Sequence, residues 1–240
     1  MTSLAIEHFA TASSSGREAR GLSYAEDWAV DELSGRTVWC ATGLTRGKNA
    51  ARAMQAQLRE FAPRELNVMA GDALRQLTQR LDTMLHGEAG GVGPADREVC
   101  AGARANGDAL VGDGVRTGDL VVLHDPLAVI LAEAVRERGA HAVWHLELVP
   151  EAPMPTRARE FLREFTWPAH ACVMAWGTRH GGHRIVTLLP SSDVVAVKEA
   201  DETGRGDRVA WATALAEVIR DDRAETVGGT LHARPVVAAR

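Results

Sequence analysis

Short apolar runs alternate along this chain with longer segments of helical periodicity. The run V-V-L at 121–123 has no polar alternation, which is typical of a central strand buried on both faces. Bounded by turn residues, each run is long enough for one strand. The predicted strands are Thr37–Thr42, Leu66–Met69, Asp119–His124, Ala142–Val149, Ala171–Trp176, Arg184–Leu189 and Pro235–Ala238.

Helical spacing fills the intervals between these runs. In Leu74–Leu85, for example, leucine recurs every three or four residues and forms one apolar stripe. Pro126 suits the first turn of a helix and Gly139 its end, and Thr156 can cap the helix that follows it. The predicted helices are Ala50–Phe61, Leu74–Leu85, Pro126–Arg138, Thr156–Phe165 and Asp207–Arg220.

Strands that alternate with helices of this length build a parallel sheet with right-handed crossovers. The sequence therefore predicts an α/β fold with a doubly wound, mostly parallel sheet. Ligands of such folds bind beyond the carboxyl ends of the strands, near the point where the strand order reverses. Residues directly after each predicted strand are the first candidates for function.

The composition and charge of the chain exclude several classes of protein. With 240 residues and 45% hydrophobic residues, the chain can bury one core, which we place at 35–240, after a helical or flexible extension at 1–34. The net charge is −5 and the basic residues are scattered, which argues against a nucleic-acid partner. We find neither a membrane-spanning run nor a signal peptide and expect a cytoplasmic protein. The three cysteines form no C-x-x-C pair and fit buried, reduced thiols.

A glycine-containing loop follows the first predicted strand and leads into a helix. Gly43 and Gly47 allow a tight turn, and the free N–H groups at the helix start could face an anion, with Arg46 and Lys48 beside it. The loop matches no established phosphate-binding motif, so an ordinary strand–helix turn is an equal alternative.

Two further strands end in polar residues. His124 ends the buried run at 119–124, and Asp125 follows it directly before Pro126, a position at which doubly wound folds expose functional groups. Taken alone, the pair is better explained by structural roles, as a helix cap (Asp125) and a core histidine (His124). His145 and Glu147 are two residues apart and so share one face of their strand. They form either a hydrogen-bonded structural pair or an acid–base pair.

Ser191 and Asp193 lie in a turn after a later strand, where they can cap a helix or bind a ligand. His180 and His183 flank two glycines, but their spacing matches no zinc pattern. We therefore expect no metal site and no cofactor.

The order of several motifs resembles the N-terminal, acceptor-side half of retaining glycosyltransferases of the GT-B architecture, nearest to the nucleotide-sugar-dependent trehalose synthase type. The resemblance covers residues 35 to 193. The motifs are GRTVWCATG (Gly35–Gly43), GDLVVLHDPLAVIL (Gly118–Leu131), VWHLELVPEAP (Val143–Pro153), REFLREF (Arg159–Phe165) and LLPSSD (Leu188–Asp193).

The resemblance implies two Rossmann-like domains facing each other across a cleft, with the acceptor sugar held mainly by the N-terminal one and a nucleotide sugar by the other. Asp125 and the 42–48 loop would then border the cleft, with His124 behind them. The chain departs from the family at Thr45–Lys48, where the family has three glycines. The family's histidine in the Trp-containing strand either falls at Glu147 or is displaced to His145. The sequence ends where the donor-binding domain would begin.

Three functional readings follow from this comparison. The chain is a sugar transferase that acts with a separate donor-domain protein or by self-association; a non-catalytic module that binds a sugar or sugar phosphate, or regulates a partner; or a fragment without a selected function. The groups that stabilise a leaving nucleoside diphosphate are missing from this sequence, and such stabilisation is usually a large catalytic contribution. We therefore expect the isolated chain to have no transferase turnover.

Overall fold

The structure is a computed structural model. It describes residues 33, 35–42, 44, 58, 61–148, 156–166, 168–177, 183–188, 196–200, 211, 215–216 and 218–219; at 42, 148, 175–177, 183–188 and 196–200 it describes the backbone alone. The extension at 1–34, the helix predicted at 50–61 and the strand predicted at 235–238 lie mostly or wholly outside these residues.

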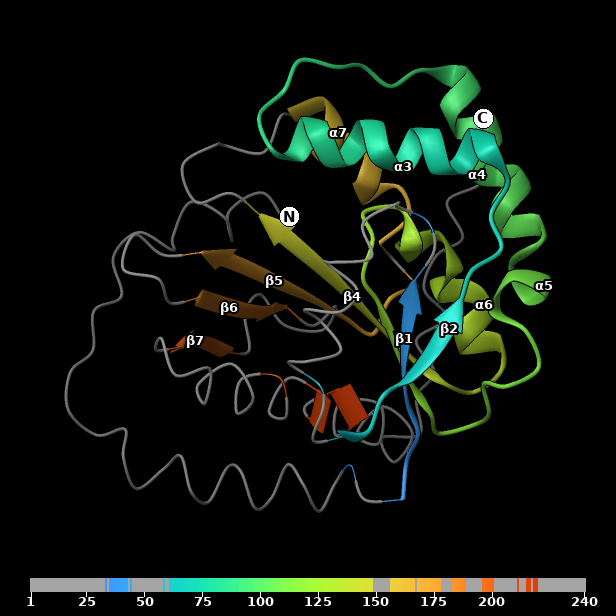
Figure 1. Cartoon of the computed structure of the whole chain (residues 1–240), viewed down its shortest axis with the longest axis vertical. Helices are drawn as coiled ribbons and strands as arrows, with labels where there is room; N and C mark the ends of the chain where they lie inside the picture. Colours follow the sequence, from blue (N-terminus) through green and yellow to red (C-terminus); the bar gives the residue numbers. More distant parts are fainter. Residues whose placement is uncertain are drawn as a thin grey trace, which may run out of the picture.

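Seven strands form one sheet in the order β2-β1-β3-β4-β5-β6-β7 (Figure 1). The first five pair in parallel, and β6 and β7 are antiparallel additions at one side. This arrangement confirms the predicted α/β fold with a mostly parallel, Rossmann-like sheet. The strands are β1 (Val38–Thr42), β2 (Arg64–Asn67), β3 (Leu120–Leu123), β4 (His141–Leu148), β5 (Ala171–Gly177), β6 (His183–Leu188) and β7 (Ala196–Ala200).

Helices cover both faces of the sheet. On one face, α3 (Asp72–Leu85), α4 (Pro94–Ala105), α6 (Ala132–Glu137) and α7 (Thr156–Arg163) pack over alternate strand residues such as Trp39, Leu123 and Trp144. On the other face, the helical residues Trp211, Leu215, Val218 and Ile219 pack against Cys40, Val122 and Val143. Trp211 and Leu215 have no exposed surface, so they belong to the core of this domain.

The middle of the sheet is apolar, and the buried acid that precedes its central strand is hydrogen-bonded. All four residues of β3 are completely buried. Asp119, just before β3, accepts hydrogen bonds from Trp39 Nε1 and from the backbone N–H of Arg116, both at 2.9 Å. Because a buried carboxylate is stable only when hydrogen-bonded, these contacts fix the start of β3 beside β1.

The segment that follows β3 differs from the predicted helix. A 3₁₀ turn (Ala128–Leu131) precedes α6, so no single helix runs over Pro126–Arg138. The carbonyl of Asp125 accepts the N–H of Ala128 at 2.9 Å, which closes a tight turn where the helix start was expected. Gly139, with φ of 72°, does end the helical segment as predicted.

Three elements were not predicted: α4, the short helix α5 (Gly107–Val111) and β7. Cys100 is the one buried residue of α4, so this helix has no apolar stripe to reveal it in the sequence. Its start is fixed instead by the Asp96 carboxylate, which accepts the N–H of Gly93 at 2.8 Å.

No helix in the described part of the chain is both long and apolar enough to cross a membrane. All three cysteines are free, and burial raises the pKa of each thiol to about 12. They are therefore protonated at neutral pH, as expected of inert core thiols.

The helix α3 should depend on its leucine stripe. Leu81 is fully buried in the core shared with the sheet, whereas Gln79 on the same helix is exposed. We expect Leu81→Ala to lower the free energy of unfolding by about 2–5 kcal/mol, because it leaves a cavity. Gln79→Ala should change it by less than about 0.5 kcal/mol. Urea denaturation of both variants measures the difference, and equal effects would contradict this packing.

Candidate functional site

The sheet reverses its strand order between β1 and β3. The chain passes from β1 outward to β2 and then returns across β1 to form β3. In doubly wound folds, this switch point is where ligands bind, beyond the carboxyl ends of the two strands. His124 and Asp125 directly follow β3 and so lie at this point, as predicted. We refer to this region as the carboxyl edge.

A second histidine joins His124 from the neighbouring strand. Nδ1 of His124 lies 2.8 Å from Nδ1 of His145 in β4, which is a hydrogen-bond distance. The two side chains are 8% and 2% exposed. His145 also meets the Trp211 ring edge-on, with 5.0 Å between ring centroids. The structure thus brings together two residues that were predicted separately.

Both histidines are neutral at physiological pH. Burial lowers the pKa of His124, and the negative charges of Asp125, Glu147 and Asp82 oppose that decrease. Burial lowers the pKa of His145 further, because no such opposing charge acts on it and because His124 lies beside it. An imidazole pair of this kind exchanges hydrogen bonds as neutral groups and carries no fixed charge.

Asp125 lies two residues beyond the end of β3, which is one of the two strands of the switch point. Its side chain is almost buried, at 6% exposed, and its carbonyl accepts the Nε1–H of Trp144 at 3.4 Å. Its charge reaches Cys40 of β1, where it adds to burial in raising the pKa of the thiol. The tight turn to Ala128 holds the backbone of Asp125. The helical turn that follows is capped at Leu127, so Asp125 does not occupy the predicted helix-cap position.

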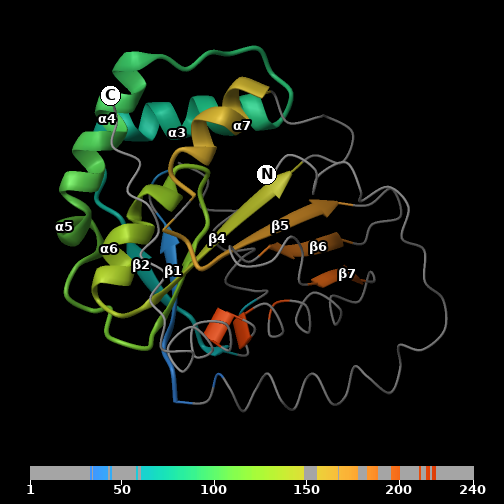
Figure 2. The same cartoon turned by 180° about the vertical axis from the view of Figure 1, so that it is seen from behind.

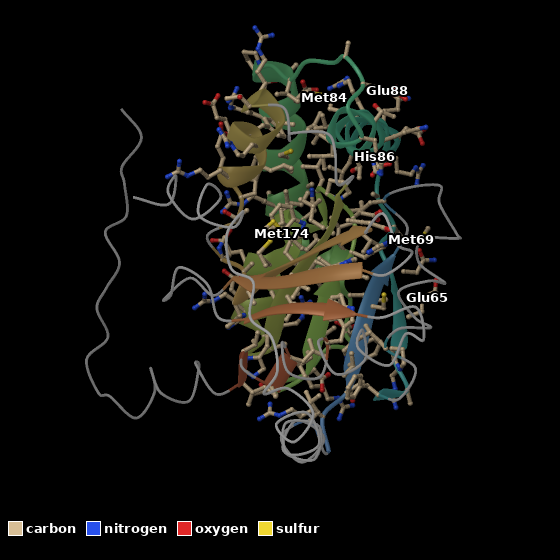
Figure 3. The ribbon with its side chains drawn as sticks, turned by 90° about the vertical axis from the view of Figure 1, so that its left-hand side faces the viewer. Glu65, Met69, Met84, His86, Glu88 and Met174 are labelled. Carbon is tan, nitrogen blue, oxygen red and sulfur yellow. The ribbon has the colours of Figure 1, made fainter. Side chains whose placement is uncertain are left out.

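The helix α3 adds two residues that the sequence did not indicate. It runs beyond the arrowheads of β1 and β4 in both opposite views (Figures 1 and 2). Burial raises the pKa of Asp82, and the charges of Asp125 and Glu147 raise it further, whereas His86 and His124 lower it. Figure 3 shows His86 near Met84 and Glu88, where α3 ends. Asp82 follows the buried Leu81 in an ordinary amphipathic pattern, so nothing in the sequence distinguishes it.

His145 and Glu147 do point from the same face of β4, but their environments differ. His145 is buried and bonds to His124, whereas Glu147 is exposed near the strand end. Glu147 influences the site by its charge on His124 and Asp82. The histidine partner of His145 therefore replaces the carboxylate partner that the spacing suggested.

The remaining predicted binding residues are Gly43, Arg46, Gly47, Lys48, Ser191 and Asp193, and all of them lie outside the described residues. Leu44, within the first of these loops, is described and buried. Among the described residues, no group of three or more His, Cys, Asp or Glu side chains is arranged to hold a metal ion.

No family model matches the sequence, and no curated protein shows significant similarity to it.

The carboxyl edge therefore combines two neutral imidazoles with three carboxylates from β3, β4 and α3. In the described part of the site, the charges that act on His124 are all negative. Such a site suits an uncharged ligand with many hydroxyl groups, which can both donate to carboxylates and accept from an imidazole N–H. A phosphate placed there would meet like charge.

The histidine pair should make stability depend on pH. Because the pKa values of His124 and His145 are lower in the folded protein than the usual 6.5, the unfolded chain binds more protons as pH falls. The stabilisation is complete above about pH 6.5 and is lost progressively below it. We expect the free energy of unfolding to decrease between pH 7 and pH 5, and to decrease less in His145→Asn. Urea denaturation over this range measures both; an unchanged slope in the variant would contradict a neutral His145.

Proposed function

We propose that this chain binds a neutral sugar at its carboxyl edge, as the acceptor-side part of a glycosyltransferase-like protein. One observation carries the proposal: at the switch point of a doubly wound sheet, His124 and Asp125 are held almost buried, next to a second neutral histidine. An imidazole N–H and a carboxylate at one position match the donor and acceptor capacity of sugar hydroxyl groups.

The class of ligand follows from charge. Asp125, Glu147 and Asp82 all act on His124, and their charges favour a ligand without phosphate at this position. The resemblance of the HDP and REFLREF motifs to trehalose synthases of the nucleotide-sugar-dependent type supports a hexose. A sugar transferase further requires a nucleotide-sugar site, which a partner protein or a second copy of this chain would supply.

A non-catalytic sugar-binding or regulatory module is the second candidate. The neutrality of both histidines favours it, because a group that transfers protons at pH 7 usually has a pKa near that value. The two candidates share the sugar site and differ in turnover. Incubation of the chain with glucose and a nucleotide-activated glucose, with product detected by chromatography, separates them.

The sugar site is tested by thermal shift and by isothermal titration calorimetry with glucose, trehalose, glucose 6-phosphate and a nucleotide-activated glucose. We expect a neutral sugar to raise Tm, since a ligand that binds only the folded state stabilises it. Asp125→Asn should weaken this binding by at least about tenfold, because a hydrogen bond to a charged group contributes about 1.5–3 kcal/mol.

Asp113→Asn is the matched control, since Asp113 is an exposed acid distant in sequence from each strand end of the site. It should leave the affinity unchanged. If no neutral sugar shifts Tm, or if both variants bind alike, the proposed function is wrong.

A further inference from the structure

The hydrogen bond between Nδ1 of His124 and Nδ1 of His145 contains a single proton. Two nitrogens 2.8 Å apart form a hydrogen bond only if one donates and the other accepts. A neutral imidazole carries one N–H, so this choice fixes both rings. If His145 donates from Nδ1, His124 carries its proton on Nε2. If His124 donates, its Nε2 is an acceptor and the proton of His145 lies on Nε2.

The ring geometry supports a direct hydrogen bond. The ring planes are within 12° of parallel and the centroids are 5.0 Å apart. That separation is close to the nitrogen–nitrogen distance plus the two ring radii, so the rings meet edge to edge in nearly one plane. An N–H and a nitrogen lone pair both lie in the ring plane, and therefore point at each other here. Nε2 of His124 lies on the far side of its ring from His145.

The buried nitrogen of His145 distinguishes the two arrangements. Its Nε2 is buried and has no hydrogen-bond partner within the described structure. An orphaned buried N–H is rarer in proteins than an orphaned acceptor. The arrangement in which His145 keeps its proton on Nδ1 leaves an acceptor at this position, and is therefore the less costly one.

The charges around His124 bear on the same arrangement. The charges of Asp125, Glu147 and Asp82 all act on this ring. Negative charge favours an N–H over a lone pair at a nitrogen that faces it. This charge is compatible with the tautomers that the buried nitrogen of His145 selects.

We propose that His145 is a positioning residue that holds His124 in its Nε2–H tautomer, so that the carboxyl edge offers a donor at His124 and an acceptor at Asp125. The role in recognition rests on the proposed sugar site. A sugar hydroxyl group can accept a hydrogen bond from His124 Nε2–H and donate one to the Asp125 carboxylate, and no proton is transferred. A ligand that contacts both groups therefore needs a hydroxyl at His124, because an ammonium group cannot accept from Nε2–H.

The tautomers are tested without any ligand. Long-range ¹H–¹⁵N spectra of protein labelled with ¹⁵N at histidine distinguish protonated from bare ring nitrogens. At pH 7.5 we expect His124 to carry its proton on Nε2 and His145 on Nδ1, with assignments from single His→Asn variants. The reversed pattern overturns the inference.

Variants at His145 test its positioning role. His145→Leu removes the partner of His124 Nδ1; we expect His124 to populate both tautomers and the affinity for the neutral sugar to fall about fivefold, the value of one net hydrogen bond. His145→Asn can donate from nearly the same place, and should restore the Nε2–H tautomer and most of the affinity. His141→Asn, in the same strand at its other end, controls for the loss of a buried histidine and should leave the His124 spectrum unchanged.

The outcomes separate this inference from the proposed function. If the tautomers are as stated but neither glucose nor trehalose binds, the sugar site is wrong and the tautomer assignment holds. If a sugar binds and His145→Leu leaves both its affinity and the His124 tautomer unchanged, the positioning role is wrong and the sugar site holds. If His145→Leu does not fold, His145→Asn and the wild-type spectrum still decide the assignment.

Discussion

The complete burial of β3 is the constraint on which the rest of this structure depends. Its four side chains are fully buried between helices on both faces, so the strand has no position at which a polar group can be solvated. Polar residues are confined to its two ends. Asp119, at the start, accepts hydrogen bonds from Trp39 and from the backbone of Arg116, and His124 and Asp125 lie at the carboxyl edge.

Burial also determines the chemistry of that edge. His124 and His145 are too deeply buried to be charged at neutral pH, and their mutual hydrogen bond substitutes for the water they lose. The surrounding carboxylates reduce the cost of a protonated His124 without removing it. The edge is consequently better suited to exchanging hydrogen bonds with hydroxyl groups than to holding an anion, and this preference follows from solvation and charge alone.

The sheet could be predicted from the sequence because its strands are apolar runs separated by amphipathic helices. β1, β3, β4, β5 and β6 were found within a residue or two of their observed bounds. The apolar stripe predicted α3, and helical spacing after a capping Thr156 predicted α7. α4 could not be, since it buries a single residue, and the tight turn after Asp125 replaces a helix start that Pro126 had suggested. Local propensity does not contain these tertiary effects.

Only part of the candidate site could be predicted from the sequence. His124, Asp125, His145 and Glu147 stand at strand ends, where a parallel sheet gathers its functional groups, so each could be named from its position. The hydrogen bond between His124 and His145 could not be predicted. Spacing along one strand relates His145 to Glu147, but it does not indicate which residue of the neighbouring strand lies beside His145. The register of β3 against β4 pairs Leu123 with Trp144, which places the next residues, His124 and His145, directly side by side. A shift of this register by one residue would separate the two rings and leave a buried imidazole without a partner, so the pairing of these strands and the chemistry of the edge depend on each other.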